Sequence, residues 1–480
     1  MSDKYFKLPK DDEHYIMVKD YVEEIPLSDY RLASDEARER FMDLKYGVRI
    51  HWGLYSVIEQ HWESWPFLMM NHQDKQEYSE LYKRFNPIGF DADEWMDLFK
   101  RTGVKCFAFT TKHHEGFSMY DTKTRVKKHV NWVAEGGPQI EDCDMAYSVM
   151  DSPFKRDIVK ELCDAAHKNN IAINLYYSHP DWHDADFRPY CGHPILTSNL
   201  EKYNSGPDIE KFKTMRAHTA FADEPTEEET NRAMKRHRDQ IIEILSNYGK
   251  IDMMCLDMWF GEPVWEYLRE TLKIARDLQP DVMLRARGIG NYGDYYTPEG
   301  FVPGKEDNTD MPWMCIYPLP KNFSYDPDAS NYKGSIWIIR NLIDTVSKGG
   351  NFMVGIGPDG EGRWHPVIVN DLEETGRWLE VNGEAIYCTR PREGELYKED
   401  NVRFTCSKDK KYVYAISLLD PGKELVLNTV QPKEGSEIKM LGVDEPLKWE
   451  YTSNKGVRII LPKSRSCTTA YSFKIEQERE

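Results

Sequence analysis

The feature that most restricts the fold of this chain is a repeated succession of short apolar runs and amphipathic segments. Apolar runs such as 251-IDMMCLD-257 end in polar or turn residues, and segments with a helical spacing of apolar residues alternate with them. Runs of this length suit strands that are buried on both faces. Because the succession continues over about 340 residues with polar groups after each strand, it predicts an α/β fold with a (β/α)8-type, TIM-like barrel.

The apolar spacing also places the individual helices and strands of this barrel. Helices are expected over 34–44, 91–102, 157–169, 227–248, 265–278 and 334–347. Strands are expected over 48–51 and 106–110, and in the apolar parts of 171–182, 251–262, 281–287 and 351–362. The charged stretch 200–235 is expected to be a surface insertion that leads into the helix at residue 227.

The character of the sequence changes near residue 390. The segments 411–419, 424–430, 456–462 and 468–475 alternate in polarity or are β-branched, and turns separate them without a helical pattern. This arrangement predicts a C-terminal antiparallel β-sandwich. The chain is therefore divided into a catalytic barrel domain over 1–389 and a β-sandwich domain over 390–480.

Composition and charge exclude several classes of partner. The formal net charge of −18 disfavours nucleic acid and anionic membrane surfaces, which require basic patches. No apolar run reaches 18 residues, so no membrane span is expected. No GxGxxG or GxxxxGK[ST] motif follows a strand, which argues against a nucleotide. A neutral substrate such as a carbohydrate remains open.

The cysteines and the N-terminus bear on the compartment. The nine cysteines include no CxxC pair, so neither a disulfide framework nor a zinc site is expected. The first residues, MSDKYFKLPKDDEHY, contain no apolar signal core. We expect a cytoplasmic protein, or a periplasmic or secreted one whose signal peptide has been removed. The oligomeric state is left open.

Two carboxylates are candidates for chemistry. Asp257 ends an apolar run, where it faces the pocket of a barrel if the run is a parallel strand. The alternative is that it caps the following turn. Glu299 lies with Asp294 in the Tyr-rich loop that follows Arg287 at the end of the next strand. Two carboxylates from successive strand ends can converge across a pocket, as glycoside hydrolysis requires.

His113 and His114 are adjacent and follow the apolar run 106–110. In a regular strand they would point to opposite faces, so both would not ligate one metal. No HxH or HExxH motif accompanies them. We expect one histidine to hydrogen-bond a ligand without a metal or cofactor, and the other to pack below it. The alternative is a pair of core histidines.

Several motifs resemble one known family. They are HWGLYS at His51, TTKHHEGF at Thr110, the strand end Tyr176-Tyr177-Ser178, the Asp257 strand, GDYYTPE at Gly293 and SKGGNFMVGIGPDGEG at Ser347. With these motifs in family order, the chain resembles the α-L-fucosidases of glycoside hydrolase family 29. The resemblance implies a (β/α) barrel with a β-sandwich, and retaining hydrolysis of terminal α-L-fucosyl residues.

The resemblance also implies roles for individual residues. Asp257 falls on the nucleophile and Glu299 on the acid/base, with Asp294 as the competing acid. Glu299 is expected to be protonated near neutral pH. The sugar is expected to contact the following side chains, of which the two tryptophans supply stacking faces: His51, Trp65, His113, His114, Tyr177, Trp259 and Arg287.

The sequence departs from the family at two points. The family usually has Trp two residues before the nucleophile, where this chain has Cys255. A Glu-Trp pair of the family appears here as Glu63-Ser64-Trp65. These changes leave an α-L-galactosidase open as a second candidate enzyme, because L-galactose differs from L-fucose by one hydroxyl on carbon six. Two roles without catalysis also stay open, namely a catalytically silent sugar-binding protein and a structural partner domain.

Overall fold

The computed structural model describes residues 6–8, 15, 18–60, 62–188, 225–258, 260–303, 309–463, 465 and 469–478. No helix within these ranges is both long enough and apolar enough to cross a membrane. Most of the insertion expected at 200–235 lies outside the described residues. A helix begins at Glu227. The side chain of Thr226 caps this helix by accepting the backbone N–H of Glu229.

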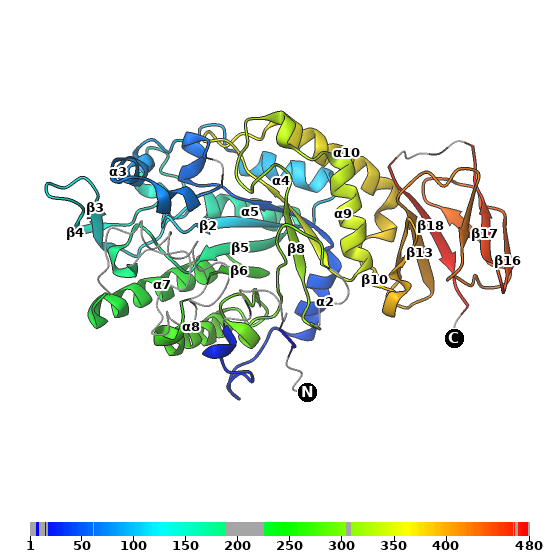
Figure 1. The fold of residues 1–480 in the computed structure, drawn as a ribbon, viewed down its shortest axis with the longest axis horizontal. Coiled ribbons are helices and arrows are strands. Elements are labelled where there is room, and N and C mark those ends of the chain that lie inside the picture. Colours follow the sequence, from blue (N-terminus) through cyan, green and yellow to red (C-terminus); the bar gives the residue numbers. More distant parts are fainter. Residues whose placement is uncertain are drawn as a thin grey trace.

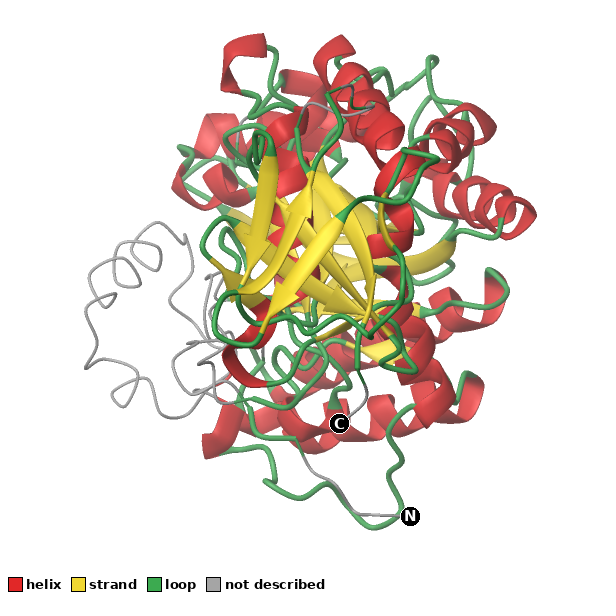
Figure 2. Ribbon diagram, turned by 90° about the vertical axis from the view of Figure 1, so that its right-hand side faces the viewer, coloured by secondary structure: helices red, strands yellow, loops and turns green. Residues whose placement is uncertain are grey.

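A curled, all-parallel sheet lies at the centre of the described chain, and helices pack around it (Figure 1). Figure 2 looks at the molecule from its C-terminal end, so the strands of the C-terminal part lie in front of this sheet. The strand order across the sheet is β7-β6-β5-β2-β1-β9-β8. The bounds are β1 (Tyr46–Ile50), β2 (Cys106–Lys112), β5 (Ala172–Ser178), β6 (Met253–Asp257), β7 (Met283–Leu284), β8 (Met314–Pro318) and β9 (Asn351–Ile356). The prediction of a parallel sheet covered by helices is confirmed.

The segment after β7 approaches the far edge of the same sheet. Arg285 forms an isolated parallel bridge with Tyr295, and Glu299 forms one with Ile316 of β8. Residues 295–299 therefore lie between β7 and β8, the two edge strands of the sheet. This placement brings Glu299 to the sheet edge where the polar strand ends gather.

The strand expected over 281–287 is reduced to the two residues of β7. The carboxylate of Asp294 accepts the backbone N–H of Leu284, so this donor is not available to a neighbouring strand. Arg285 still donates its backbone N–H to the carbonyl of Met254 in β6. The chain therefore stays beside β6, while its other edge is held by the Asp294 carboxylate and by backbone hydrogen bonds to Asp294 and Tyr295.

Three of the expected helices begin at a capping residue that the sequence supplies. Ser34, Asp91 and Asp157 are N-caps, because each side chain accepts a backbone N–H of the first turn. The helices are α2 (Asp35–Leu44), α3 (His72–Ser79), α4 (Ala92–Arg101), α5 (Ile158–Asn169), α7 (Glu227–Asn247), α8 (Trp265–Leu278), α9 (Ser335–Ser347) and α10 (Pro366–Asn382). A two-stranded ribbon, β3 (Val126–Asn131) with β4 (Gln139–Met145), lies beside α3 at one end of the molecule (Figure 1).

The core beneath the HWG motif fixes the end of β1. The ring of Trp52 is fully buried among Phe85, Phe90 and Trp95, with ring centroids 5.4–5.7 Å away. Its indole N–H donates to the carbonyl of Asp359 at 3.0 Å. Because Trp52 is held on several sides, the preceding His51 has a fixed position at the strand end.

The C-terminal part of the described chain consists of two antiparallel sheets (Figure 1). One has the order β10-β12-β13-β18-β15 with β11 beside β12, and the other has the order β14-β17-β16. The bounds are β10 (Arg390–Pro391), β11 (Lys398–Glu399), β12 (Val402–Cys406), β13 (Tyr412–Ser417), β14 (Glu424–Leu427), β15 (Ile438–Met440), β16 (Trp449–Thr452), β17 (Gly456–Ile460) and β18 (Tyr471–Glu476). Buried side chains of both sheets, such as Phe404 and Leu427, form one hydrophobic cluster between them.

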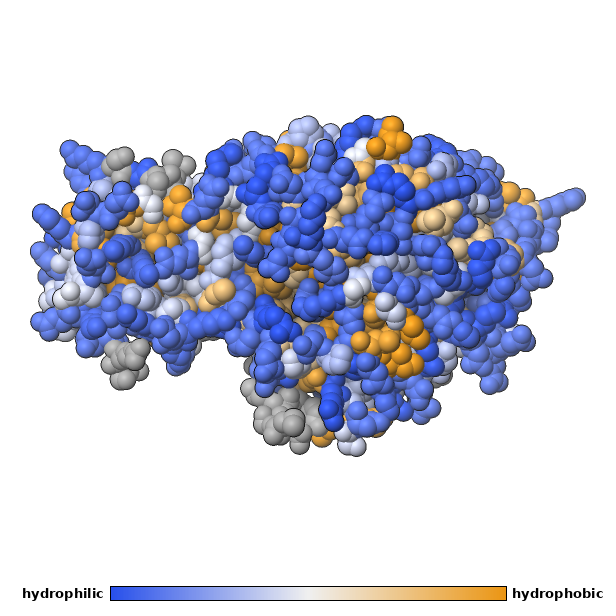
Figure 3. Space-filling model, turned by 180° about the vertical axis from the view of Figure 1, so that it is seen from behind, coloured by the Kyte–Doolittle hydropathy of each residue, from blue (hydrophilic) through white to orange (hydrophobic). Residues whose placement is uncertain are grey.

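This all-strand part packs against helices α9 and α10. The indole N–H of Trp378 donates to the carbonyl of Ala470 at 3.1 Å. Arg403 of β12 donates to the carboxylate of Asp344 in α9 at 2.8 Å. In Figure 1 the two sheets lie at the end of the molecule away from β3, β4 and α3. The face seen from behind is mainly hydrophilic, with apolar side chains in small groups (Figure 3).

The glycine at the start of β17 yields a test of the C-terminal packing. Gly456 has a φ of +70°, and a Cβ atom there would lie 2.1 Å from the carbonyl oxygen of Leu427. Gly435 has a φ of +74° but open space around an added Cβ. We expect Gly456→Ala to lower the free energy of unfolding by about 1–3 kcal/mol more than Gly435→Ala, as measured by urea denaturation. Equal losses of stability in the two variants would show that backbone strain alone, without the close contact to Leu427, accounts for the effect.

Candidate active site

Asp257 closes strand β6 and is buried among cationic and hydroxyl donors. Its Oδ1 accepts from Arg287 at 2.8 Å and from Arg285 at 3.2 Å, and its Oδ2 accepts from the Tyr176 hydroxyl at 2.7 Å. Burial alone raises the pKa of this carboxyl, but the two guanidinium groups outweigh burial and hold the pKa well below its ordinary value. Asp257 is therefore an ionised carboxylate at the carboxyl end of a parallel strand.

Glu299 shares the same two arginines. Its Oε1 accepts from Arg285 at 2.8 Å and lies 3.3 Å from Nη1 of Arg287, and about a third of its side chain is exposed. Burial raises the pKa of Glu299, but Arg287 and Arg285 lower it below its ordinary value, against the smaller opposing effect of Asp257. The expectation of a protonated Glu299 near neutral pH is therefore wrong for the ligand-free protein, because two cations face the carboxylate.

The shared arginine limits the distance between the two carboxylates. Nη1 of Arg287 lies 2.8 Å from Oδ1 of Asp257 and 3.3 Å from Oε1 of Glu299. The two oxygens are therefore at most about 6 Å apart, which fits the spacing of about 5–5.5 Å between the carboxyl groups of a retaining glycosidase.

A third buried arginine completes the cationic side of the cluster. Arg49 of β1 and Arg285 each donate to Sγ of Cys255, both at 3.0 Å. The guanidinium of Arg49 also lies 4.5 Å above the ring of Tyr176. Cys255, the departure from the family, therefore contacts two guanidinium groups beside Asp257. Neither arginine was expected from the sequence, although Arg285 lies two residues before Arg287 and hence on the same face of an extended chain.

Three histidines line the cluster on the side of β1 and β2. The His51 ring lies 4.9 Å from Phe323 and 5.9 Å from His113. Burial and the nearby Arg49 hold the pKa of His51 well below its ordinary value, so this imidazole is neutral. A neutral imidazole both donates and accepts one hydrogen bond, which suits a sugar hydroxyl.

His113 and His114 lie on the same side of the sheet, contrary to the expectation of opposite faces. Their ring centroids are 4.3 Å apart. Strand β2 ends at Lys112, so the alternation of a regular strand does not extend to these two residues. His113 Nδ1 lies 2.5 Å from the hydroxyl of Ser64, and His114 Nε2 lies 3.7 Å from Oδ2 of Asp257.

The prediction for Tyr177 is corrected by the structure. Its hydroxyl donates to the amide oxygen of Gln240 in α7 at 2.7 Å, on the outer side of the sheet. The preceding Tyr176 donates to Asp257 instead. Successive side chains of a strand point to opposite faces, so only one of the two tyrosines can reach the site.

Asp294 is excluded as the competing acid. It is fully buried, it pairs with the guanidinium of Arg276, and it accepts the backbone N–H groups of Ala33 and Leu284 at 2.8 Å each. Its oxygens are therefore occupied in joining the N-terminal segment to β7.

The two predicted stacking residues have different outcomes. Trp65 is half-buried and lies 4.9 Å from His114 and 5.6 Å from Trp182, measured between ring centroids. Trp65 is therefore brought to the cluster. Trp259 lies outside the described residues.

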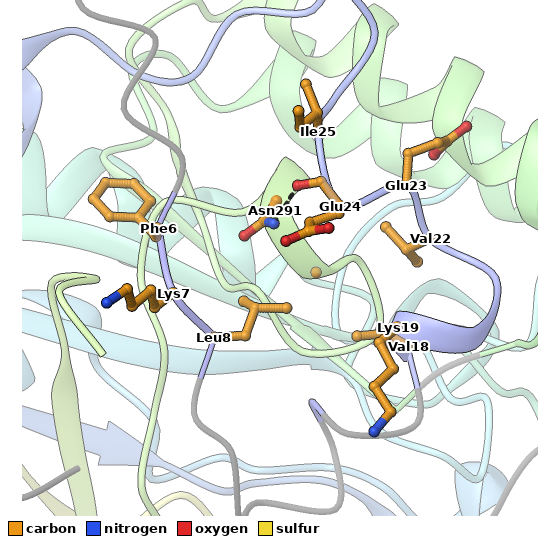
Figure 4. Close-up of a pocket in the computed structure, with 11 residues that line it drawn as sticks. Phe6, Lys7, Leu8, Val18, Lys19, Val22, Glu23, Glu24, Ile25 and Asn291 are labelled. Carbon is orange, nitrogen blue, oxygen red and sulfur yellow. Dashed lines mark hydrogen bonds between the residues drawn. The ribbon is translucent and has the colours of Figure 1, made fainter. Parts of the chain in front are cut away.

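No metal centre accompanies these groups in the described ranges, where no set of three or more His, Cys, Asp or Glu residues has the geometry to hold an ion. A pocket of about 680 Å³ lies elsewhere, between the N-terminal segment and the turn at Gly290 (Figure 4). Figure 4 shows the side-chain amide of Asn291 bonded to the carbonyl of Glu24 at its edge. None of its lining residues belongs to the carboxylate cluster.

The geometry defines a class of enzyme. An ionised carboxylate and a second carboxylate within about 6 Å, at the carboxyl ends of parallel strands and flanked by imidazole and indole rings, define a retaining glycoside hydrolase. The family model described as Alpha-L-fucosidase matches residues 23–384, and the model described as Alpha-L-fucosidase C-terminal domain matches 397–476. The chain belongs to the α-L-fucosidase family, glycoside hydrolase family 29, as its motifs predicted.

Characterised relatives resemble the chain over most of its length. The tissue α-L-fucosidase of Bos taurus is 29% identical over an alignment of 451 positions, and the match covers 88% of this chain and 84% of the relative. The plasma α-L-fucosidase of Homo sapiens is 28% identical over an alignment of 446 positions, and the match covers 88% of this chain and 85% of the relative.

Solved structures share the fold. The α-L-fucosidase isoenzyme 1 from Paenibacillus thiaminolyticus superposes with a TM-score of 0.75 at 24% identity, and the match covers 93% of this chain and 99% of that one. A trapped covalent intermediate of the family 29 α-L-fucosidase from Bacteroides thetaiotaomicron superposes with a TM-score of 0.73 at 21% identity, over 95% of this chain and 99% of that one.

The contacts of Asp294 lead to a stability prediction. Asp294→Ala leaves the buried guanidinium of Arg276 without its carboxylate, so we expect the free energy of unfolding to fall by about 3–5 kcal/mol. Asp164→Ala removes an exposed pair with Lys160, which lies 2.5 Å away, and should cost less than about 1 kcal/mol. Urea denaturation measures both. A loss of activity by Asp294→Ala without a loss of stability would instead make Asp294 part of the chemistry.

Proposed function

We propose that this protein releases terminal α-L-fucosyl residues from glycans with Asp257 as the nucleophile and Glu299 as the acid/base. The observation that carries the assignment is the shared contact of both carboxylates with Arg287. Arg287 holds the ionised Asp257 at the strand end and Glu299 on the other side of a gap that can accommodate an anomeric carbon.

In the first step, Asp257 attacks the anomeric carbon and forms a covalent glycosyl–enzyme. Its low pKa keeps it ionised, and the Tyr176 hydroxyl and Arg287 orient it. Glu299 donates a proton to the glycosidic oxygen as the bond to the leaving group breaks. The aglycone leaves with that proton.

In the second step, a water molecule replaces the aglycone. Glu299, now ionised, accepts a proton from this water as its oxygen attacks the anomeric carbon. The bond to Asp257 breaks, and the carboxylate returns to its two arginines. Two inversions at the anomeric carbon give net retention.

The arginines set the fraction of active enzyme. Glu299 is mainly ionised in the ligand-free protein because Arg287 and Arg285 lower its pKa. The first step uses the fraction in which Glu299 carries a proton while Asp257 is ionised. This fraction increases toward acid pH until Asp257 itself is protonated.

The sugar binds through neutral polar groups and a ring face. His51, His113 and His114 supply hydrogen bonds to hydroxyl groups, and Trp65 supplies an aromatic face. No cofactor takes part in this mechanism. The family assignment favours an L-fucosyl substrate over an L-galactosyl substrate and over a role without catalysis.

We also propose the finer architecture. The segment 295–299 takes the place of the eighth barrel position between β7 and β8, which makes the curled sheet a (β/α)8-type barrel. We place the catalytic domain at 1–389 and the β-sandwich domain at 390–480, since β10 begins at Arg390 after the last helical turn of the barrel.

Three pieces of information support this proposal. The family model covers both carboxylates. The Bacteroides thetaiotaomicron structure with the same fold is a trapped covalent intermediate with 2-fluoro-fucosyl fluoride. A structure from Thermotoga maritima with the same fold is described as a complex with fucose.

The two carboxylates should respond differently to substitution. Asp257→Asn should lower turnover by about 10³-fold or more on every fucoside, because the nucleophile is lost. Glu299→Ala should spare nitrophenyl fucosides more than natural glycosides, because an activated leaving group needs little protonation. Azide should restore part of the activity of Glu299→Ala. Steady-state kinetics and NMR of the first product measure these effects.

Two results would contradict these roles. A product with inverted anomeric configuration would remove the nucleophile role of Asp257. Full activity of Glu299→Ala on natural glycosides would remove its acid/base role.

The pH profile tests the influence of the arginines on Glu299. Activity requires protonated Glu299, so kcat/KM falls as pH rises through its pKa. Arg285 lowers that pKa, so Arg285→Met should raise it and move the alkaline limb to higher pH. Arg458→Met, which removes an exposed pair with Glu424, is the control and should leave the limb in place. A shift of the limb to lower pH by Arg285→Met would contradict the assignment.

A further inference from the structure

An exposed tryptophan lies beside residues that are bound into the site. Trp62 is 42% exposed, whereas the next residue, Glu63, is 4% exposed and Ser64 is fully buried. All three belong to the segment that joins β1 to α3. This segment follows the carboxyl end of a barrel strand, where such enzymes bind their substrates.

Each residue that follows Trp62 is fixed by a contact of its own. The Glu63 carboxylate accepts the backbone N–H of Ser324 at 2.8 Å, and Ser64 bonds to His113. The Trp65 ring packs against His114, and its backbone N–H donates to the Trp62 carbonyl at 3.3 Å. The backbone of Trp62 is therefore held at the rim of the site, while about two-fifths of the residue is exposed to solvent.

The backbone of this segment is strained. Trp62 has a φ of +78° and Glu63 a φ of +49°, both in the left-handed region that large side chains rarely adopt. A glycine would adopt this conformation without strain. A tryptophan here costs both backbone strain and exposed apolar surface, and such outliers cluster at ligand sites.

We propose that Trp62 is a stacking platform for the pyranose ring to which the fucosyl residue is attached. This inference rests on the proposed function of the same site. With the fucosyl ring held among His51, His113 and His114, the glycosidic oxygen must point outward, toward Glu299 and the rim. The next sugar ring then leaves the pocket at its edge, where the flat indole of Trp62 can cover its apolar C–H face.

The platform acts in both steps of the reaction. In the first it binds the leaving sugar. In the second it binds an acceptor sugar in place of water: the acceptor hydroxyl oxygen bonds to the anomeric carbon, its proton passes to Glu299, and the Asp257 ester bond breaks. Trp62 therefore raises the ratio of sugar transfer to hydrolysis, and this ratio does not depend on the amount of folded enzyme.

The test compares substrates with and without a sugar leaving group. α-L-Fucosyl fluoride releases only fluoride, whereas the disaccharides α-L-fucosyl-1,2-galactose and α-L-fucosyl-1,3-N-acetylglucosamine release a pyranose. Trp62→Ala should lower kcat/KM on the preferred disaccharide by about ten-fold or more and change it less than about two-fold on the fluoride. Trp62→Tyr keeps a flat ring and should stay within about three-fold on both.

Three further measurements separate binding from structure. Trp62→Gly should raise the melting temperature, because glycine relieves the strain, and still lose disaccharide activity as Trp62→Ala does. With fucosyl fluoride as donor and methyl β-D-galactoside or free N-acetylglucosamine as acceptor, Trp62→Ala should lower the transfer-to-hydrolysis ratio about five-fold. Tyr451→Ala, which removes a ring that is 38% exposed in the C-terminal sheet, should change none of these.

The outcomes distinguish this inference from the proposed function. A wild-type protein that hydrolyses no fucoside would overturn both. If the wild type is active, equal losses by Trp62→Ala on fluoride and disaccharide, no loss on either, or an unchanged transfer ratio would overturn the platform alone. A lower melting temperature for Trp62→Gly would show that the indole stabilises the fold instead.

Discussion

The structure depends on the way two arginines hold two carboxylates together. Arg285 and Arg287 follow β7 on one face of the chain, and both are nearly fully buried. Two carboxylates within about 6 Å in a buried site would otherwise raise each other's pKa. The guanidinium groups reverse this effect and keep Asp257 ionised at the end of β6. The geometry of the candidate active site is therefore set by buried charges that the fold brings together.

The surroundings of this cluster support the same arrangement. Asp294 joins the chain after β7 to the N-terminal segment and so fixes the start of the loop that carries Glu299. Cys255 accepts hydrogen bonds from Arg49 and Arg285, and it shares Nη1 of Arg285 with Oδ1 of Asp257. The C-terminal sheets pack on α9 and α10, and the contacts described at this junction involve none of the site residues.

Much of the fold was predictable because its signals are local. Residues 265–278 were expected as a helix and form α8. Asp157 is the N-cap of α5, which begins at the next residue. Strand β8 and helix α10 were not expected. β8 is a five-residue run that ends in Pro318, and proline within a run argues against a strand. The expected strand at 281–287 is reduced to β7, where the side-chain carboxylate of Asp294 accepts the backbone N–H of Leu284 in place of a strand carbonyl.

The sequence by itself determined the parallel sheet, the position of Asp257 at a strand end and the family, because these depend on periodicity and motif order. Only the tertiary structure decided that Tyr176 rather than Tyr177 reaches Asp257, that Asp294 is structural, and that Glu299 is ionised when no sugar is bound. Each of these depends on which charges and donors meet in a buried space. Electrostatic free energy is set by distances of a few ångströms between residues far apart in the chain, and no local pattern encodes those distances.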